Sequence, residues 1–190
     1  MLFGALVFLS AHFGQEGDIQ AGCGVRCPEP TELRFDVTDF GATPDNATDE
    51  DLFAFQAAID RAATVSLENN SCAVVSVPPG TYHFQKTVDK YRGGLVLKSN
   101  VCLIGEDRDR TIIASMVPMH TIGLHQVDNT SIENLIIDNY STVTDSVGTH
   151  GIRLSHSRNI LLQSLSVRNA NHYGIGFQGG SFQNITLNDI

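Results

Sequence analysis

Apolar and polar residues alternate over short stretches in the second half of the chain, and these stretches recur at a fixed interval. Residues 122–139 (IGLHQVDNTSIENLIIDN) align without a gap on residues 152–169 (IRLSHSRNILLQSLSVRN) at a shift of 30 residues. A third copy begins at Ile175, and an earlier, weaker copy lies in residues 97–105 (LKSNVCLIG). Alternation is the period of a β-strand, and a repeat of this length is typical of one turn of a solenoid. The Asn-, Ser- and Gly-rich corners favour a parallel β-helix over a leucine-rich repeat.

The repeat also predicts which side chains stack from coil to coil. Superposing the copies gives one interior column of apolar residues: Leu103, Ile132, Leu162 and Leu187. It also gives a column of asparagines at a corner, which we expect to form a ladder of amide hydrogen bonds: Asn100, Asn129, Asn159 and Asn184. The chain is therefore predicted to be an all-β solenoid.

A different unit precedes the solenoid. Leu52, Phe55, Ile59 and Ala62 have helical spacing, which predicts an amphipathic helix near residues 49–64. Thr48 and Asp51 form the pattern of a capping box, and the acidic residues 49–51 complement the helix dipole. We therefore expect these acidic residues to have structural roles and not to form a metal site. Residues 73–84 (AVVSVPPGTYHF) predict a buried strand and a turn. The helix is expected to cover the open end of the first coil, whose unpaired strand edges would otherwise invite aggregation.

Composition narrows the class of protein. The 190 residues are 42% hydrophobic and 17% charged, which suits one folded domain. A formal charge of −9 argues against non-specific binding to nucleic acid or to an anionic membrane. Residues 2–9 form an apolar run, which is too short to cross a bilayer and matches the length of the core of a signal peptide.

Residues 1–22 are accordingly predicted to be a signal or disordered segment and residues 23–34 an N-terminal arm, with the protein secreted. The even number of cysteines suits disulfides in that setting: Cys72 with Cys102, and Cys23 and Cys27 holding the arm. Free buried thiols are the alternative, and the spacing disfavours zinc. Five sequons are present, at Asn46, Asn69, Asn129, Asn139 and Asn184, of which the asparagine ladder would occupy Asn129 and Asn184.

Three segments carry a resemblance to a known family. Residues 39–60 (DFGATPDNATDEDLFAFQAAID), 74–84 (VVSVPPGTYHF) and 95–105 (LVLKSNVCLIG) resemble the opening of the pectate-lyase-like right-handed parallel β-helix superfamily. That superfamily includes polygalacturonase-like and rhamnogalacturonase-like enzymes and mannuronan carbon-5 epimerases. The resemblance covers residues 35–190. It implies a right-handed single-stranded parallel β-helix with an N-terminal capping α-helix, incomplete at its C-terminal end.

The order of motifs is similar to that of the alginate epimerase branch, because NLIIDN is followed by a loop, a strand and HYGIGFQ. Those enzymes carry Tyr-Gly-x-Asp-Pro-His where this chain has Tyr173-Gly174-Ile175-Gly176-Phe177-Gln178. The tyrosine is kept, whereas Gly176 and Gln178 replace the aspartate and the histidine. The resemblance therefore implies action on, or binding of, an acidic polysaccharide, with much of the acid–base equipment changed.

Strand alternation predicts which side chains face outward. Arg153 lies in a column with Gly123 and Gly176, where its guanidinium could grip a sugar carboxylate with two hydrogen bonds. The next outward column, also predicted to bind substrate, contains His125, Ser155 and Gln178. An ordinary surface arginine is the alternative reading.

The loop of residues 140–149 lengthens its coil and is expected to bring Asp145 and His150 near Arg153 and Tyr173. Asp145 is predicted to contact substrate. His150 or His172 is a candidate general base, and Tyr173 a candidate proton donor or acceptor by resemblance. A hydrolase would need two outward carboxylates, and only Asp138, Asp145 and Asp189 are near.

The sequence thus predicts a carbohydrate-active β-helix of lyase or epimerase type. A non-catalytic carbohydrate-binding or adhesive β-helix and a polygalacturonase-like hydrolase remain alternatives, so whether the protein is an enzyme stays open. We expect a monomer without a cofactor, since no specific motif supports calcium or another metal.

Overall fold

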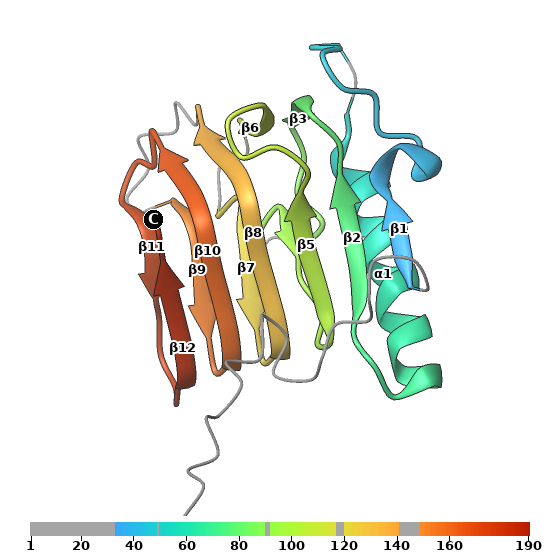
Figure 1. Cartoon of the computed structure of the whole chain (residues 1–190). Coiled ribbons are helices and arrows are strands. Elements are labelled where there is room, and N and C mark those ends of the chain that lie inside the picture. Colours follow the sequence, from blue (N-terminus) through green and yellow to red (C-terminus); the bar gives the residue numbers. More distant parts are fainter. Residues whose placement is uncertain (1–32, 49, 90–91, 117–119, 141–148) are drawn as a thin grey trace, which may run out of the picture.

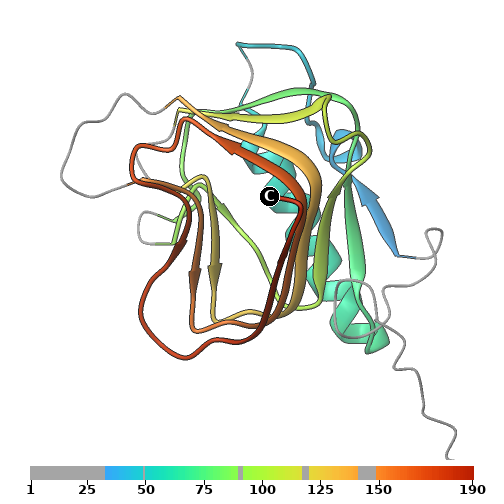
Figure 2. The same cartoon turned by 60° about the vertical axis from the view of Figure 1, so that its left-hand side comes forward.

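The computed structural model describes residues 33–48, 50–89, 92–116, 120–140 and 149–190. Within them the chain forms a parallel β-solenoid of about four turns, with two sheets facing each other across one core (Figures 1 and 2). The predicted segments at residues 1–22 and 23–34 lie almost wholly outside the described residues. In the part of the chain that is described, no helix is long and apolar enough to cross a membrane.

The long sheet has the strand order β1 (Arg34–Asp36), β2 (Ala73–Val77), β5 (Val101–Gly105), β8 (Asp128–Asn139), β10 (Arg158–Arg168) and β12 (Gln183–Asn188). β3 (Gly80–Phe84) pairs with β6 (Thr111–Ser115), which pairs with the second half of β8. The short sheet has the order β4 (Leu95–Val96), β7 (Ile122–His125), β9 (His150–Ser155) and β11 (Tyr173–Phe177). All pairs between these strands are parallel, as a solenoid requires.

The predicted interior column is confirmed. Leu103 pairs in register with Ile132, Ile132 with Leu162, and Leu162 with Leu187. The first three side chains are fully buried, whereas Leu187 is 48% exposed because it lies in β12, the last strand of the long sheet. The core therefore grows by one layer with each coil.

The asparagine ladder is confirmed, except that Asn159 bonds to a neighbouring aspartate and not to Asn129. Asn129 donates to Asn100 Oδ1 (3.2 Å) and Asn184 to Asn159 Oδ1 (2.8 Å), but Asn159 donates to Asp128 Oδ1 (2.7 Å). All four asparagines have positive φ, between 51° and 60°. Asparagine tolerates this left-handed conformation better than most residues, which explains its place at the corner.

The helix α1 (Leu52–Asn69) begins and ends later than predicted, and the capping box is wrong. Thr48 bonds to the side chain of Asn46, and no side chain at Asp51 caps the helix. The buried Asp51 carboxylate instead accepts hydrogen bonds from the backbone N–H groups of Thr43 (2.8 Å) and His83 (2.7 Å). Its structural role is confirmed, but by joining the loop at Thr43 to strand β3 rather than by capping.

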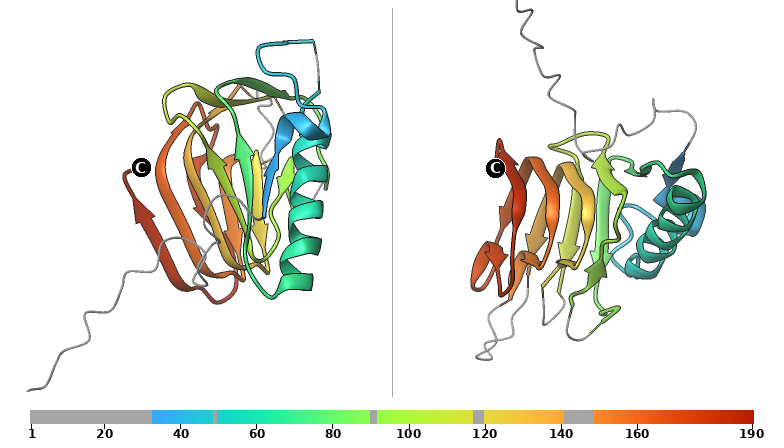
Figure 3. Two further views of the ribbon diagram at one scale, coloured as in Figure 1. Left: turned by 45° about the vertical axis from the view of Figure 1, so that its right-hand side comes forward. Right: turned by 90° about the horizontal axis from the view of Figure 1, so that it is seen from below.

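Helix α1 contacts β1, β2, β4 and β5, and lies at the end of the solenoid opposite β12 (Figure 3). Phe55 packs edge-on against Tyr82 and Phe84, each with ring centroids 5.1 Å apart. Gln56 donates to the Val96 carbonyl (3.1 Å) and accepts from the Val96 N–H (3.0 Å). β4 is the edge strand of the short sheet on the side of α1. The Gln56 side chain therefore forms the hydrogen bonds to the Val96 backbone that a further strand would otherwise form.

Cys72 and Cys102 are both buried and belong to one small cluster with Val74 and Ile104. Cys23 and Cys27 lie outside the described residues. Cys102 is disulfide-bonded, but not to Cys72, so the predicted Cys72–Cys102 pair is wrong and the pairing of Cys23 and Cys27 stays a prediction.

Candidate functional site

The outer face of the short sheet carries three adjacent columns of side chains. Gly123 pairs with Arg153, and Arg153 with Gly176, so the predicted central column is confirmed. His125 pairs with Ser155, and Gln178 follows at the end of β11, where its N–H bonds to the Leu154 carbonyl. The remaining column, at the start of the strands, consists of His120, His150 and Tyr173.

The two glycines that flank Arg153 have little room for a side chain. A Cβ atom added to Gly123 would lie 1.8 Å from the carbonyl oxygen of Arg92, and one added to Gly176 would lie 2.9 Å from the ring of His150. Gly176 is therefore required by the histidine packed above it.

Arg153 is held by a neutral histidine. Its Nη1 lies 2.9 Å from His120 Nε2, and the backbone nitrogen of His150 lies 3.2 Å from His120 Nδ1. His120 is only 3% exposed. Burial, followed by the charge of Arg153 and then by His150, lowers the pKa of His120 from 6.5 to about 3. Burial also lowers the pKa of Arg153.

His150 is the centre of an aromatic stack. Its ring is nearly parallel to that of His120, with centroids 4.7 Å apart, and to that of Tyr173, at 5.5 Å. His172 lies against both His150 (5.2 Å) and Tyr173 (3.9 Å). Burial, then His172 and Arg153, lower the pKa of His150, and a backbone hydrogen bond at Tyr173 partly offsets this. His150 is 7% exposed and Tyr173 56%, so a ligand on this face would meet the tyrosine first.

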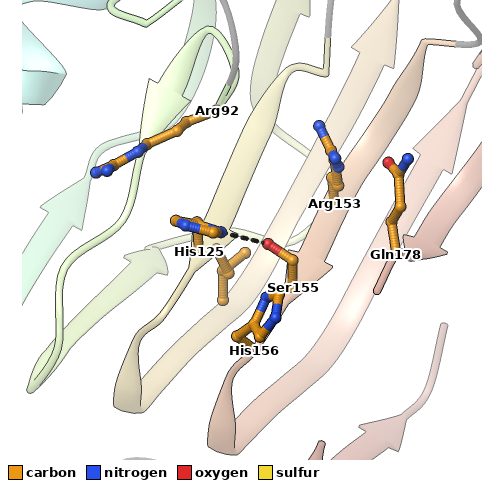
Figure 4. Close-up of a pocket in the computed structure, with 7 residues that line it drawn as sticks. Arg92, His125, Arg153, Ser155, His156 and Gln178 are labelled. Atoms are coloured by element: carbon orange, nitrogen blue, oxygen red, sulfur yellow. Dashed lines mark hydrogen bonds between the residues drawn. The ribbon is translucent and has the colours of Figure 1, made fainter. Parts of the chain in front are cut away.

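Beside Arg153 the face is hollowed. A depression of about 210 Å³ is lined by Arg92, Leu124, His125, Arg153, Ser155, His156 and Gln178 (Figure 4). His125 Nδ1 and Ser155 Oγ share a hydrogen bond of 2.6 Å, and Figure 4 shows Arg92, Arg153 and Gln178 around them. The lining holds two arginines and two histidines but, among the described residues, no carboxylate.

Burial is the first cause that lowers the pKa of His125, and the charge of Arg92 is the second. The hollow is therefore an electropositive site whose permanent charges are the guanidinium groups. In an acidic protein, such a site is suited to an anionic ligand with planar oxygens, such as a carboxylate.

The structure brings most of the predicted residues together on this face: Arg153, His125, Ser155, Gln178, His150, His172 and Tyr173. Asp145 lies outside the described residues, so its role stays a prediction. Two residues were missed, His120 and Arg92. His120 stands 30 residues before His150, so extending the repeat alignment by two residues would have found it.

The two described acidic residues that were considered for hydrolysis lie elsewhere. Asp138 accepts hydrogen bonds from the Tyr140 hydroxyl (2.9 Å) and Asn169 (2.7 Å), and Asp189 pairs with Arg108 (2.8 Å). Neither lines the hollow. Among the described residues there is also no group of three or more His, Cys, Asp or Glu side chains that could hold a metal ion.

Known proteins resemble this chain in sequence and in fold. Over 81 residues, or 43% of the chain, it is 37% identical to mannuronan C5-epimerase AlgE3 and 36% identical to alginate lyase 7, both of Azotobacter vinelandii. These matches cover only 4% and 9% of the two relatives, so the chain spans a small part of their length. A solved ι-carrageenase in complex with ι-carrageenan fragments superposes with a TM-score of 0.56 at 19% identity, over 85% of this chain and 42% of that one. At that identity the superposition supports the fold alone.

One family covers nearly all of the described chain. Residues 34–190 match the family described as rhamnogalacturonase A/epimerase, pectate lyase-like. The parallel solenoid, its stacked interior and the outer columns of the short sheet agree with this match. The chain belongs to the pectate-lyase-like rhamnogalacturonase/epimerase family.

Proposed function

We propose that the outer face of the short sheet binds an acidic polysaccharide, with Arg153 gripping the carboxylate of one uronate residue. The observation that carries the proposal is the hollow beside Arg153, which is lined by arginines and histidines and by no carboxylate among the described residues. Arg92, at the rim, is partly engaged by Asp89 at 3.7 Å and would contact a neighbouring acidic residue of the same polymer. Relatives named for mannuronan and alginate chemistry support this substrate class.

Proton transfer at carbon 5 of a uronate is the reaction that these groups suit best. A guanidinium on the carboxylate stabilises the negative charge that develops when the carbon 5 proton leaves. His150, His172 and Tyr173 form one ring cluster next to the Arg153 column, and the lowered pKa of His150 keeps its ring neutral and able to accept a proton.

The outcome of proton removal distinguishes two activities. In epimerisation, the proton returns to carbon 5 from the opposite face. In elimination, the bond from carbon 4 to the glycosidic oxygen breaks, a double bond forms between carbons 4 and 5, and the leaving oxygen takes up a proton. Tyr173, which is exposed, is the proposed group to deliver that proton.

A non-catalytic binder is the second candidate, favoured by Gly176 and Gln178 at the positions where the epimerases have an aspartate and a histidine. It shares the Arg153 site and lacks the proton transfer. The two candidates differ in turnover, not in ligand.

The test is to measure binding to polymannuronate, polygalacturonate and a neutral glucan, and then turnover. Arg153→Ala should weaken uronan binding by about tenfold or more, since hydrogen bonds to charged groups contribute about 1.5–3 kcal/mol. Arg110→Ala, which removes an arginine that is 74% exposed and lies outside the hollow, is the matched control and should bind as the parent does.

Turnover is followed by the absorbance of unsaturated products and by the proton spectrum of the polymer. Tyr173→Phe should abolish turnover while leaving binding within about threefold, because it removes only the hydroxyl. Binding without any turnover by the parent protein would favour the binder. Equal binding by the parent and by Arg153→Ala would refute the site.

We further infer that the solenoid is right-handed, that α1 protects its N-terminal end, and that the protein is a secreted, disulfide-bonded monomer. The family and the Gln56–Val96 hydrogen bonds support the first two. Hydrogen bonds at Asn129 and Asn184 agree with the expectation that these two sequons carry no glycan.

A further inference from the structure

His120 faces more hydrogen-bond donors than it can serve. The Arg153 Nη1 group and the His150 N–H are both donors without acceptor capacity, and they contact the two different ring nitrogens of His120 at 2.9 Å and 3.2 Å. A neutral imidazole has one acceptor nitrogen and one N–H group. Only one of the two contacts can therefore be a hydrogen bond at a given moment.

Each tautomer of His120 satisfies a different neighbour. With the proton on Nδ1, Nε2 accepts from Arg153, and the His150 N–H faces another N–H. With the proton on Nε2, Nδ1 accepts from His150, and the Arg153 Nη1 group can no longer donate to His120. A protonated ring would serve neither donor, and the lowered pKa of His120 excludes it near neutral pH.

A carboxylate bound in the hollow would change this balance. Its oxygens would accept from the guanidinium of Arg153 more strongly than a neutral ring nitrogen does, because donor and acceptor would then both be charged and the pair can form two parallel hydrogen bonds. His120 would then be free to accept from the buried backbone N–H of His150. The ring nitrogen thus holds Arg153 in place and can be exchanged for a ligand oxygen.

We propose that His120 is a positioning residue that holds Arg153 for a ligand carboxylate and moves its ring proton from Nδ1 to Nε2 when that ligand binds. This inference rests on the proposed function, since it concerns the same Arg153 site. The exchange involves no net protonation: one proton leaves Nδ1 to solvent and another is taken up at Nε2. Stacking of the His120 ring on His150, at 4.7 Å, keeps both nitrogens directed at their donors.

Two substitutions test the hydrogen-bond acceptor of His120 and its aromatic ring separately. His120→Phe keeps an aromatic ring for stacking on His150 but has no acceptor, so binding of an oligomannuronate should weaken by about tenfold. His120→Gln has an amide oxygen that can accept from Arg153, so its affinity should stay within about threefold of the parent. Circular dichroism and thermal melting check that both variants are folded.

The tautomer is read directly from the ¹⁵N shifts of the imidazole ring in the histidine-labelled protein, because protonated and unprotonated ring nitrogens resonate far apart. Without ligand, we expect Nε2 to be the unprotonated nitrogen, and with saturating oligomannuronate we expect Nδ1. An unchanged tautomer at saturation, or parental affinity in His120→Phe, would overturn the inference while Arg153→Ala still tests the proposed function. If Arg153→Ala binds as the parent does, the proposed function itself fails.

Discussion

The burial of His120 in a neutral state should make the fold sensitive to mild acid. The side chain is 3% exposed and its pKa is lowered from 6.5 to about 3, so below pH 6.5 the unfolded chain binds a proton that the folded protein does not. The free energy of unfolding must then decrease as the pH falls from 6.5 toward 3. At pH 5 the difference is about 1.5 pKa units, or about 2 kcal/mol at 1.36 kcal/mol per unit.

The assay is urea unfolding at pH 7, 6 and 5 of the parent protein and of His120→Gln and His120→Asn. Other groups titrate in all three proteins, including His150 and His125, whose pKa values are also lowered, so only the difference isolates His120. Between pH 7 and pH 5 the parent should lose about 2 kcal/mol more than either variant. The slope of unfolding free energy against urea concentration should stay the same, which checks that the unfolding transition is comparable.

The two variants serve as controls for each other. Glutamine and asparagine differ in length, so they should differ in stability at pH 7, but neither titrates, so their losses on acidification should agree. Parallel curves of stability against pH for the parent and both variants would refute the reasoning, because they would show that the protonated and neutral forms of His120 are equally compatible with the fold.

Two further predictions concern the frame that holds the site. Gly123→Ala should lower the free energy of unfolding by about 1–3 kcal/mol, because the added Cβ would lie 1.8 Å from the Arg92 carbonyl oxygen. Gly174→Ala, where the nearest atom would be 3.6 Å away, should leave the stability nearly unchanged. Equal melting temperatures for the two variants would contradict this steric account. Ile132→Ala should lower the free energy of unfolding by about 2–5 kcal/mol, because its fully buried side chain lies between Leu103 and Leu162. Leu187→Ala, in the same column but 48% exposed, should lower it clearly less. An equal loss of stability in the two variants would argue against the interior column as the main source of stability.

The interior of the solenoid could be predicted because it repeats. A gapless shift of 30 residues forces equivalent positions into register, so Ile132 and Leu162 had to pair once the fold was a parallel solenoid. The same shift predicted that Gly123 lies beside Arg153, and the shorter step to the third copy predicted that Gly176 lies on its other side. Only the strand period and the coil length are needed for these predictions, and both are visible in the sequence.

Contacts that a single side chain forms with one non-repeating neighbour could not be predicted from the repeat. Asn159 donates to the Asp128 carboxylate rather than to Asn129, since a charged acceptor next to the ladder forms the stronger hydrogen bond. Asp51 joins a loop to strand β3 through backbone N–H groups, a role that no local motif indicates. The properties of His120 likewise follow from its burial, its stacking on His150 and its contact with Arg153, three features that only the folded coil produces.

The distribution of acids and bases explains how a chain with a formal charge of −9 can present an electropositive hollow. Described carboxylates near these coils are engaged in structural contacts: Asp128 with Arg158 at 2.7 Å, and Asp189 with Arg108 at 2.8 Å. Charges are screened over about 10 Å at 0.1 M salt, so groups within a few ångströms decide what a bound carboxylate experiences. A carboxylate in place of His120 would hold Arg153 more tightly, but it would also neutralise the guanidinium. A neutral imidazole fixes the position of the cation without itself neutralising its charge.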